Sequence, residues 1–263
     1  MNLIDKQNQK IKEEGRLGLM THVVAGYPDL EETRKMILMM VTSGVDFIEI
    51  QIPFSDPLGD GPTIRVANTI ALENGFKVKD AFELVRKLRE EDGVEIPLLF
   101  MTYFNIVHHY GIEKFCLDAS NIGIDGLIIP DYTYEAESHD HLQKLASEKG
   151  MYLIDFLSLD TSLEHTKEVG NKANGFIYCF SQRGVTGANG SVVEELSGHL
   201  SKIRELVDCP LAVGFGISKA KDIEDLKGKT DIAIVGSAVI KAYNEKGFSG
   251  AKEKVKEFVS ALN

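Results

Sequence analysis

The chain has 263 residues, 43% of them hydrophobic, so it is long enough for one large α/β domain or two ordinary ones. Its net charge of −11 argues against nucleic acid or an anionic membrane as a partner. Three scattered cysteines, a polar N-terminus and no apolar run of membrane-spanning length together predict a cytoplasmic protein with reduced thiols.

Apolar runs alternate with amphipathic segments from one end of the chain to the other. A charged amphipathic stretch at 4–14 predicts a leading helix that ends at Gly15. Eight strands are expected at 17–24, 47–52, 96–103, 126–130, 152–156, 175–180, 211–214 and 231–235. The first of them is followed by a helix that ends at Gly44, and further helices are expected at 64–73, 78–91, 112–120, 134–149, 163–169 and 192–207, then up to 226, up to 243 and from 249.

This order of elements predicts an α/β fold. The strands are continuous apolar runs, which is typical of parallel strands buried on both faces. Eight strands, each followed by helix, fit a single (β/α)8 TIM barrel with an extra N-terminal helix. No linker or change of composition divides the sequence, so residues 1–263 are expected to form one domain. An open, doubly wound sheet is the alternative.

The second expected strand and its loop carry two carboxylates. Glu49 lies inside an apolar run that ends at Pro53, and Asp60 lies in the Pro/Gly-rich loop beyond it. A carboxylate in a buried strand is costly unless it is paired or functional. Glu49 therefore fits either a salt-bridged structural residue or a catalytic acid. A partly buried strand-end Glu should hold its proton more readily than a loop Asp with donors nearby.

The loops after the seventh and eighth strands are rich in glycine. They read Gly214-Phe-Gly-Ile-Ser218 and Val235-Gly-Ser-Ala238, and each leads directly into a helix. In a barrel these are the usual positions of a phosphate site made of backbone N–H groups and helix N-termini. The alternative is that these glycines only allow close packing of helices. A dinucleotide is not favoured, because only half of the glycine fingerprint is present and it follows the seventh strand.

Several of these motifs resemble the signature of the tryptophan synthase alpha chain family. The most specific is Glu49 followed by Pro-Phe-Ser-Asp-Pro at 53–57 and Asp-Gly-Pro at 60–62. The resemblance continues through Asn105, Pro130-Asp131, 184–187, 214–218 and Gly236-Ser237, so it covers nearly the whole chain. It implies a lyase that cleaves indole-3-glycerol phosphate to indole and glyceraldehyde 3-phosphate by a retro-aldol reaction, without a metal or organic cofactor.

The resemblance also implies a role for individual residues. Glu49 would be the general acid and base, and Asp60 would accept the indole N–H. Tyr178 would flank the indole, and Thr186 and Gly187 would belong to a mobile lid. The phosphate would be held by Gly187, Gly216, Gly236 and Ser237. The partner would be a PLP-dependent beta chain, faced by the loops that carry Asp56, Pro57, Asn105 and Asp131.

Four positions depart from the family pattern. Gln51 and Gly59 stand where Gly and Ala are usual, His22 replaces an aromatic or apolar residue, and Thr133 replaces a common proline. These departures bear on the pocket and on partner binding, but they remove no catalytic group. A stand-alone lyase, a non-catalytic barrel that only binds and activates a beta chain, and another phosphosugar enzyme remain alternatives.

Histidine pairs offer little evidence for a metal site. His108-His109 are expected in a loop, and His139 and His141 on a polar helix, all at the surface.

Overall fold

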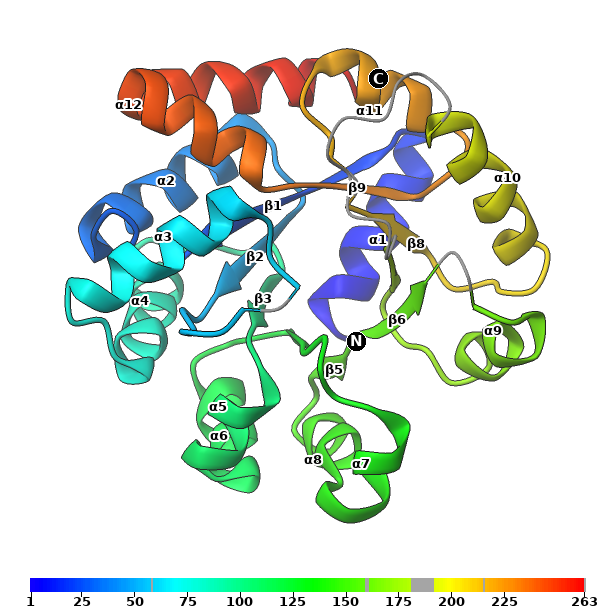
Figure 1. Ribbon diagram of the computed structural model, residues 1–263, viewed down its shortest axis with the longest axis horizontal. Coiled ribbons are helices and arrows are strands. Elements are labelled where there is room, and N and C mark those ends of the chain that lie inside the picture. Colours follow the sequence, from blue (N-terminus) through cyan, green and yellow to red (C-terminus); the bar gives the residue numbers. More distant parts are fainter. Residues whose placement is uncertain (58, 159–160, 181–191, 215, 263) are drawn as a thin grey trace.

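The computed structural model describes residues 1–57, 59–158, 161–180, 192–214 and 216–262. Within these residues, nine strands form one sheet in the order β5-β4-β3-β2-β1-β9-β8-β7-β6, and all neighbours are parallel (Figure 1). The strands are β1 Gly18–Val24, β2 Phe47–Gln51, β3 Leu98–Met101, β4 Gly126–Ile128, β5 Tyr152–Leu153, β6 Asp155–Ser158, β7 Ile177–Phe180, β8 Leu211–Val213 and β9 Ile232–Val235.

The strands β5 and β6 together close the barrel. They are two parts of one extended stretch, separated only by Ile154. β5 pairs with β4 on one side, β6 pairs with β7 on the other, and the Ile154 N–H donates to the carbonyl of Leu127 at 2.8 Å. The fifth expected strand is therefore present, extends to Ser158 and divides its pairing between two neighbours. The predicted eight-membered (β/α)8 ring is confirmed, and the open sheet is excluded.

Helices surround the ring (Figure 1). They are α1 Leu3–Glu14, α2 Leu30–Ser43, α3 Pro62–Glu73, α4 Val78–Glu90, α5 Phe104–Tyr110, α6 Ile112–Asn121, α7 Tyr134–Asp140, α8 Leu142–Glu148, α9 Leu163–Gly170, α10 Val192–Arg204, α11 Ala220–Leu226 and α12 Ser237–Ser260. A non-helical backbone at Gly247 separates the two helices that the sequence predicted within α12. No described helix is both long and apolar enough to cross a membrane.

Two expectations about helices are wrong. The single helix expected at 134–149 is interrupted at His141, whose φ is 53°. The side chain of Glu137 then accepts the backbone N–H groups of Gln143 and Lys144 at 2.8 and 3.2 Å, which caps the start of α8. His108 and His109 lie in the helix α5 rather than in a loop.

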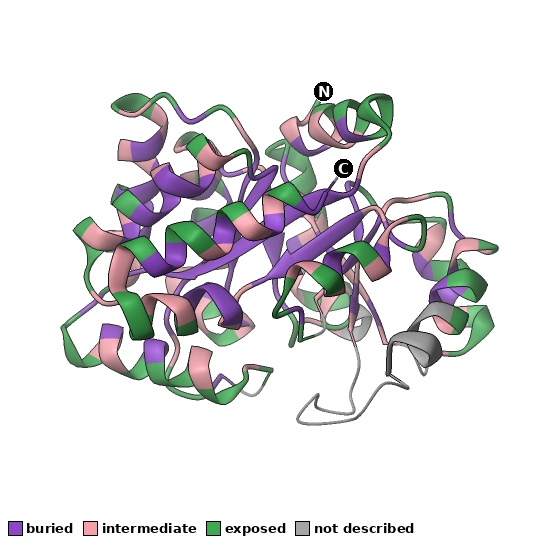
Figure 2. Cartoon of the chain, turned by 90° about the horizontal axis from the view of Figure 1, so that it is seen from above, coloured by how far each residue is buried: buried purple, intermediate pink, exposed green. Residues whose placement is uncertain are grey.

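The strands are mostly buried (Figure 2), and the buried side chains form two clusters, one inside the barrel and one beneath the helices. Along β2, Ile48 and Ile50 belong to the large cluster beneath the helices, whereas Phe47 belongs to the cluster inside the barrel. Because side chains alternate along a strand, Glu49 points inward like Phe47. The same alternation places His22 two residues beyond the interior Met20 of β1. The interior thus changes from apolar to polar toward the carboxyl ends of the strands.

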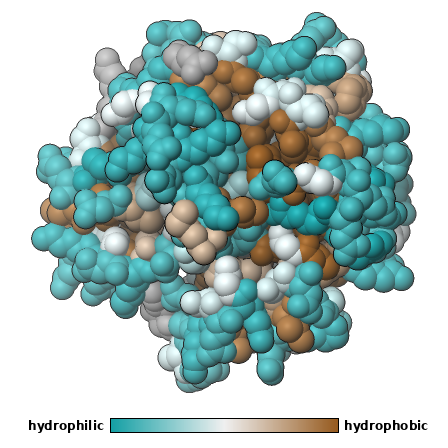
Figure 3. All heavy atoms as spheres, turned by 180° about the vertical axis from the view of Figure 1, so that it is seen from behind, coloured by the Kyte–Doolittle hydropathy of each residue, from teal (hydrophilic) through white to brown (hydrophobic). Residues whose placement is uncertain are grey.

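The helix α1 covers the amino ends of the strands. Its buried residues Ile4 and Ile11 join the interior cluster. A Cβ placed on Gly18, at the start of β1, would lie 2.7 Å from Ile11 Cδ1, and one on Gly126, at the start of β4, would lie 3.0 Å from Ile4 Cδ1. Glycine at these two positions therefore gives the side chains of α1 room that a Cβ would take. Figure 3, which shows the face opposite to that of Figure 1, is largely hydrophilic, with apolar areas of which the broadest lies at the upper right.

Candidate functional site

Glu49 occupies the centre of the candidate site. It lies on β2 between His22 of β1 and Leu99 of β3 in the strand register, and only 3% of it is exposed. His22 Nδ1 is 3.3 Å from Glu49 Oε1, and this is the ion-pair contact that Glu49 makes among the described residues. Burial lowers the pKa of His22, but the charge and hydrogen bond of Glu49 outweigh it, with smaller contributions from Asp60 and Gln51. The pKa of His22 is therefore raised above its ordinary value of 6.5.

Three buried polar atoms of this site have no hydrogen-bond partner in the described part of the chain. They are His22 Nε2, Glu49 Oε2 and Gln51 Oε1. Unpaired buried polar groups cost free energy, so a folded protein keeps them mainly where a ligand or water completes them. All three come from the carboxyl-terminal halves of β1 and β2. The interior therefore offers a set of unused donors and acceptors at the end of the barrel where such enzymes carry out their chemistry.

Asp60 is connected to the polar residues His22, Glu49 and Gln51 through a hydrogen bond with Gln51. The Gln51 side-chain Nε2 donates to Asp60 Oδ2 at 2.6 Å, and the backbone N–H of Gly59 donates to the hydroxyl of Tyr103 at 3.2 Å. Burial raises the pKa of Asp60, against the lowering effects of the His22 charge and the Gln51 hydrogen bond. For Asp60 itself, desolvation outweighs those donors, and that Glu49 holds its proton more readily than Asp60 stays a prediction.

Tyr178 interacts electrostatically with both carboxylates, Glu49 and Asp60. It follows the interior residue Phe176 by two positions on β7 and stacks at a tilt on Phe156, with ring centroids 5.3 Å apart. Burial, and then the charges of Glu49 and Asp60, raise its pKa well above 10. A Cβ on Gly214, after β8, would lie 2.9 Å from the Tyr178 hydroxyl. The two acids, the tyrosine and the loop after β8 thus belong to one region.

The loops after β8 and β9 reach this region. Gly216 is exposed and has a φ of 53°, in the left-handed range that suits glycine. Gly236 is the residue before α12, Ser237 is the first residue of that helix, and no side chain in the described part of the chain caps this end. A Cβ on Gly236 would lie 3.0 Å from the Cβ of His22, so this loop runs directly beside β1. Backbone N–H groups at such a helix start suit an anion.

Other predicted residues fall elsewhere. Thr186 and Gly187 lie outside the described residues. Three residues expected to face a partner are exposed, namely Asp56, Asn105 and Asp131, whereas Pro57 is buried. Asn105 belongs to α5 rather than to a loop, and Asp131 Oδ1 accepts the backbone N–H at the start of α5, on Phe104, at 2.8 Å.

Sequence reasoning missed the contacts of His22 and Gln51. Both were noted as departures from the family pattern, but not as direct partners of Glu49 and Asp60. The pairing of His22 with Glu49 depends on the register between β1 and β2, and the Gln51 contact depends on how the loop folds back. Glu49 and Gln51 are two residues apart on one strand, so their side chains point to the same face. This spacing could have indicated from the sequence that Gln51 shares the site of Glu49.

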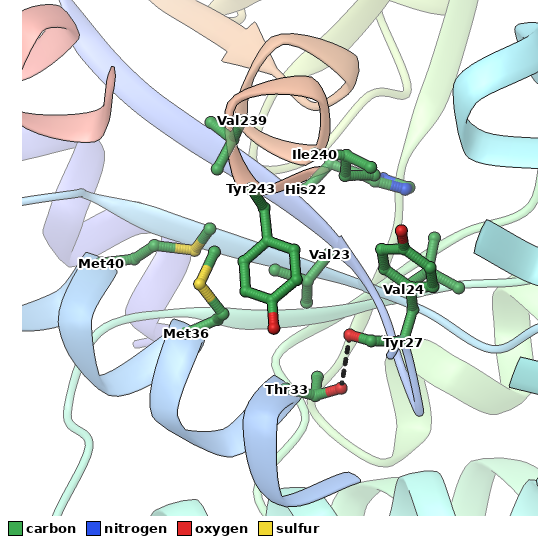
Figure 4. A pocket seen from close by; sticks show the side chains of 10 residues that line it. All are labelled: His22, Val23, Val24, Tyr27, Thr33, Met36, Met40, Val239, Ile240 and Tyr243. Atoms are coloured by element: carbon green, nitrogen blue, oxygen red, sulfur yellow. Dashed lines mark hydrogen bonds between the residues drawn. The ribbon is translucent and has the colours of Figure 1, made fainter. Parts of the chain in front are cut away.

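Two further features lie apart from this site. A narrow apolar cavity lies outside the barrel, between β1, α2 and α12, and is lined by residues such as Val23, Met36, Met40 and Tyr243 (Figure 4). His108, His109, His139 and His141 are exposed, as expected. Among the described residues, no three His, Cys, Asp or Glu side chains gather as a set of metal ligands.

Comparison with known proteins agrees with this geometry. The sequence pattern of the tryptophan synthase alpha chain family matches residues 8–262. The tryptophan synthase alpha chain of Thermoanaerobacter sp. (strain X514) is 41% identical over 266 residues, which cover 100% of this chain and 98% of that protein. A solved structure from Aquifex aeolicus VF5 has a TM-score of 0.90 at 33% identity, with 100% of both chains covered. A chain of tryptophan synthase from M. tuberculosis has a TM-score of 0.89 at 25% identity, with 100% and 99% covered. This chain therefore belongs to the tryptophan synthase alpha chain family.

Proposed function

We propose that this chain is a carbon–carbon lyase that cleaves indole-3-glycerol phosphate to indole and glyceraldehyde 3-phosphate, as the alpha subunit of tryptophan synthase. The observation that carries the proposal is the arrangement of two acids at one end of the barrel. Glu49 on β2 lies beside His22, and Asp60 is hydrogen-bonded to Gln51 of the same strand. The glycine loops after β8 and β9 run beside Tyr178 and His22. Membership of the family supports the same reaction.

Glu49 would exchange two protons in one turnover. An indole carbanion is a poor leaving group, so C3 of the ring must be protonated before the C–C bond breaks. Glu49 would give its proton to C3 and take the proton of the hydroxyl next to that bond. The bonding electrons would then return to the ring, and the hydroxyl carbon would become the aldehyde of glyceraldehyde 3-phosphate. No proton is gained or lost overall, and Glu49 ends as it began.

Asp60 would stabilise the charge that develops on the ring. Protonation at C3 places positive charge on the indole nitrogen, and an ionised Asp60 that accepts the N–H would stabilise this state more than the neutral substrate. Its support is the Gln51 amide, which donates to one carboxylate oxygen, Oδ2, and so fixes the orientation of the Asp60 side chain. Tyr178 and Phe156, which stack on each other, would provide an apolar wall for the ring.

The phosphate would be held without a lysine or arginine side chain. Gly216, Gly236 and Ser237 are proposed to donate backbone or hydroxyl groups, and the first helix of α12, which ends at the break at Gly247, adds a favourable dipole at its start. Thr186 and Gly187 are proposed, on family resemblance alone, to close over the substrate.

A direct assay tests the reaction. The purified chain is incubated with indole-3-glycerol phosphate, and indole is measured with and without a tryptophan synthase beta chain. Indole released only or much faster with the beta chain supports the alpha-subunit role, whereas full turnover by the chain alone supports a stand-alone lyase. No indole under either condition would refute both and leave a barrel that only activates its partner.

The variant Glu49→Gln tests the proton-transfer role. The amide keeps the shape of the side chain but cannot exchange the proton, so we expect turnover to fall by about 10²–10⁴-fold while substrate binding changes little. Binding is measured by calorimetry with the inactive variant. A rate near that of the wild type would assign the proton transfer to another group.

We also propose that the partner is a PLP-dependent beta chain and that it docks on the face bearing Asp56, Asn105 and Asp131. These three residues are exposed and follow β2, β3 and β4, at the end of the barrel that holds Glu49. Docking there would let indole pass to the partner without crossing the barrel. A cytoplasmic location is proposed as well, supported by three cysteines that are free thiols.

A further inference from the structure

His22 contacts the proposed catalytic acid, Glu49, and its position is not explained by packing alone. It faces Glu49 across the β1–β2 register, its Nδ1 is 3.3 Å from Glu49 Oε1, and the two residues are 5% and 3% exposed. Its second ring nitrogen, Nε2, is buried and has no hydrogen-bond partner among the described residues. A histidine retained only for packing would not need to leave one nitrogen unpaired beside a buried carboxylate.

We propose that His22 is a positioning residue for Glu49: its Nδ1–H holds the carboxylate, and its protonated Nε2–H is a donor to an oxygen of the bound substrate. The proposal rests on the lyase function proposed above. The unpaired Oε2 of Glu49 is then left free to exchange protons with the substrate. Because the N–H bonds of Nδ1 and Nε2 diverge from the ring in different directions, one imidazole can touch both the acid and the substrate.

The surroundings of the ring indicate which part of the substrate it would reach. A Cβ on Gly236 would lie 3.4 Å from His22 Cδ2, the carbon bonded to Nε2, and 3.0 Å from His22 Cβ. This edge of the imidazole therefore lies along the loop that opens α12. A substrate whose phosphate sits at that helix start would bring its glycerol oxygens past Nε2. His22 would thus connect the phosphate end of the site with the acid that acts at the indole end.

The charges around His22 favour its protonated form. Glu49 faces it from β2 and Asp60 from the loop after β2, while the neighbouring segment of β9, Ile234–Gly236, carries no charge. On the outer side of β1, Tyr243 of α12 lines the same cavity as His22. These acids raise the pKa of His22 above 6.5 in spite of burial. The Nε2–H is therefore present below the raised pKa and is lost as the pH rises through it.

Two variants and a control separate this role from packing. In His22→Asn and His22→Gln, we expect kcat/KM for indole-3-glycerol phosphate to fall by about 10–100-fold, as for the loss of a hydrogen bond to a charged group. The decline in wild-type activity at alkaline pH should also vanish. His139→Asn, an exposed histidine on α7, should change neither quantity. The proposal is overturned if the His22 variants keep the alkaline decline, or if their kcat/KM stays within about twofold of the wild type.

A spectroscopic titration tests the contact independently of turnover. In ¹⁵N-labelled protein, the imidazole nitrogens of His22 should titrate with a midpoint above 6.5, and Glu49→Gln should shift that midpoint to lower pH because burial then acts without the carboxylate charge. A wild-type midpoint at or below 6.5, or one unmoved by Glu49→Gln, would overturn the proposal. If wild-type protein released no indole with or without a beta chain, the lyase function would fail, whereas this titration would still report on the His22–Glu49 pair.

Discussion

Asp60 is a carboxylate that the fold keeps in an unfavourable place. Burial raises its pKa above 3.8, although the His22 charge and the Gln51 amide lower it. The sign for stability follows from linkage: a carboxyl group whose pKa is higher in the folded state binds its proton more tightly there. At neutral pH the ionised form therefore destabilises the folded chain. Such a cost is typical of a charge held for catalysis rather than for stability.

The variant Asp60→Asn should separate activity from stability. The amide can still accept from Gln51 but carries no charge, so we expect the rate of indole release to fall by about 100-fold. The thermal midpoint at pH 7 should rise, and this gain should shrink as the pH falls through the raised pKa of Asp60. Differential scanning calorimetry at several pH values measures the effect. Asp208→Asn, at an exposed position, is the control, and a lower midpoint for Asp60→Asn would contradict the argument.

The sequence located the two acids but not their partners. Glu49 stood out because a carboxylate inside an apolar run is unusual, and Asp60 because it follows in a Pro/Gly-rich loop. Both signals are local. The His22–Glu49 pair and the Gln51–Asp60 bond join residues through strand register and loop folding, which no local pattern fixes.

At the scale of elements, one arrangement recurs at the amino ends of the strands. The residue before β2, β4 or β9 is an aspartate that accepts the backbone N–H of a neighbouring strand and pairs with an arginine. The three sets are Asp46 with Leu19 and Arg16, Asp125 with Leu98 and Arg89, and Asp231 with Leu211 and Arg204. Each set, called an Asp–Arg clasp below, joins two parallel strands at the end opposite the site, where barrels concentrate stabilising contacts.

Two arginines of α4 provide a matched test of these clasps. Arg89 bonds Asp125 at 2.7 Å and the carbonyl of Gly123 at 3.0 Å, and both charged side chains are mostly buried. Among the described residues, Arg86, one turn earlier, pairs with exposed Glu83 and Glu90 of the same helix. Arg89→Ala should lower the free energy of unfolding by about 3 kcal/mol, because it leaves a buried charge unpaired. Arg86→Ala should lower it far less, because water already screens these exposed pairs. Equal losses in urea titrations would count against the clasp.

The helix α1 offers a second test at this scale. Ile4 is fully buried and lies against glycines at the amino ends of the strands, whereas Lys6 on the same helix is exposed. Ile4→Ala should destabilise the chain by about 2–5 kcal/mol, as for other buried Ile truncations. Lys6→Ala should change the free energy of unfolding by less than about 0.5 kcal/mol. Similar values for both variants, measured by urea denaturation, would mean that α1 does not seal the barrel.

Most elements were predictable because their signals are local. β2 and β4 end near prolines, α1 ends at Gly15, and the strands are apolar throughout. The break at His141 was not, because neither glycine nor proline marks it and the cap comes from Glu137, in the preceding helix. The division of the fifth strand at Ile154 depends on pairing with two different neighbours, which is a property of the closed ring.

At the scale of the whole molecule, the two ends of the barrel have different tasks. The amino end is filled by α1 and held by the three Asp–Arg clasps, while the carboxyl end carries the unpaired polar atoms of His22, Glu49 and Gln51. That residues 1–263 form one domain stays a prediction. It is supported by an interior cluster that takes side chains from α1 and from most strands of the ring, from β1 to β9.

The same asymmetry predicts where a beta chain binds. If the partner receives indole from the carboxyl end, a bulky charge at Asn105, in the helix after β3, should disturb docking, whereas the same change at Asn171, just after α9 at the amino end, should not. Both asparagines are exposed, so Asn105→Lys and Asn171→Lys alter the folded chain to a similar small extent. We expect Asn105→Lys to weaken beta-chain binding by about tenfold or more, as for a truncated or blocked interface contact. Indole release by the isolated chain should remain unchanged. Binding is measured by calorimetry with a purified beta chain. Equal affinities for the two variants, or a loss confined to Asn171→Lys, would move the interface to another face of the barrel.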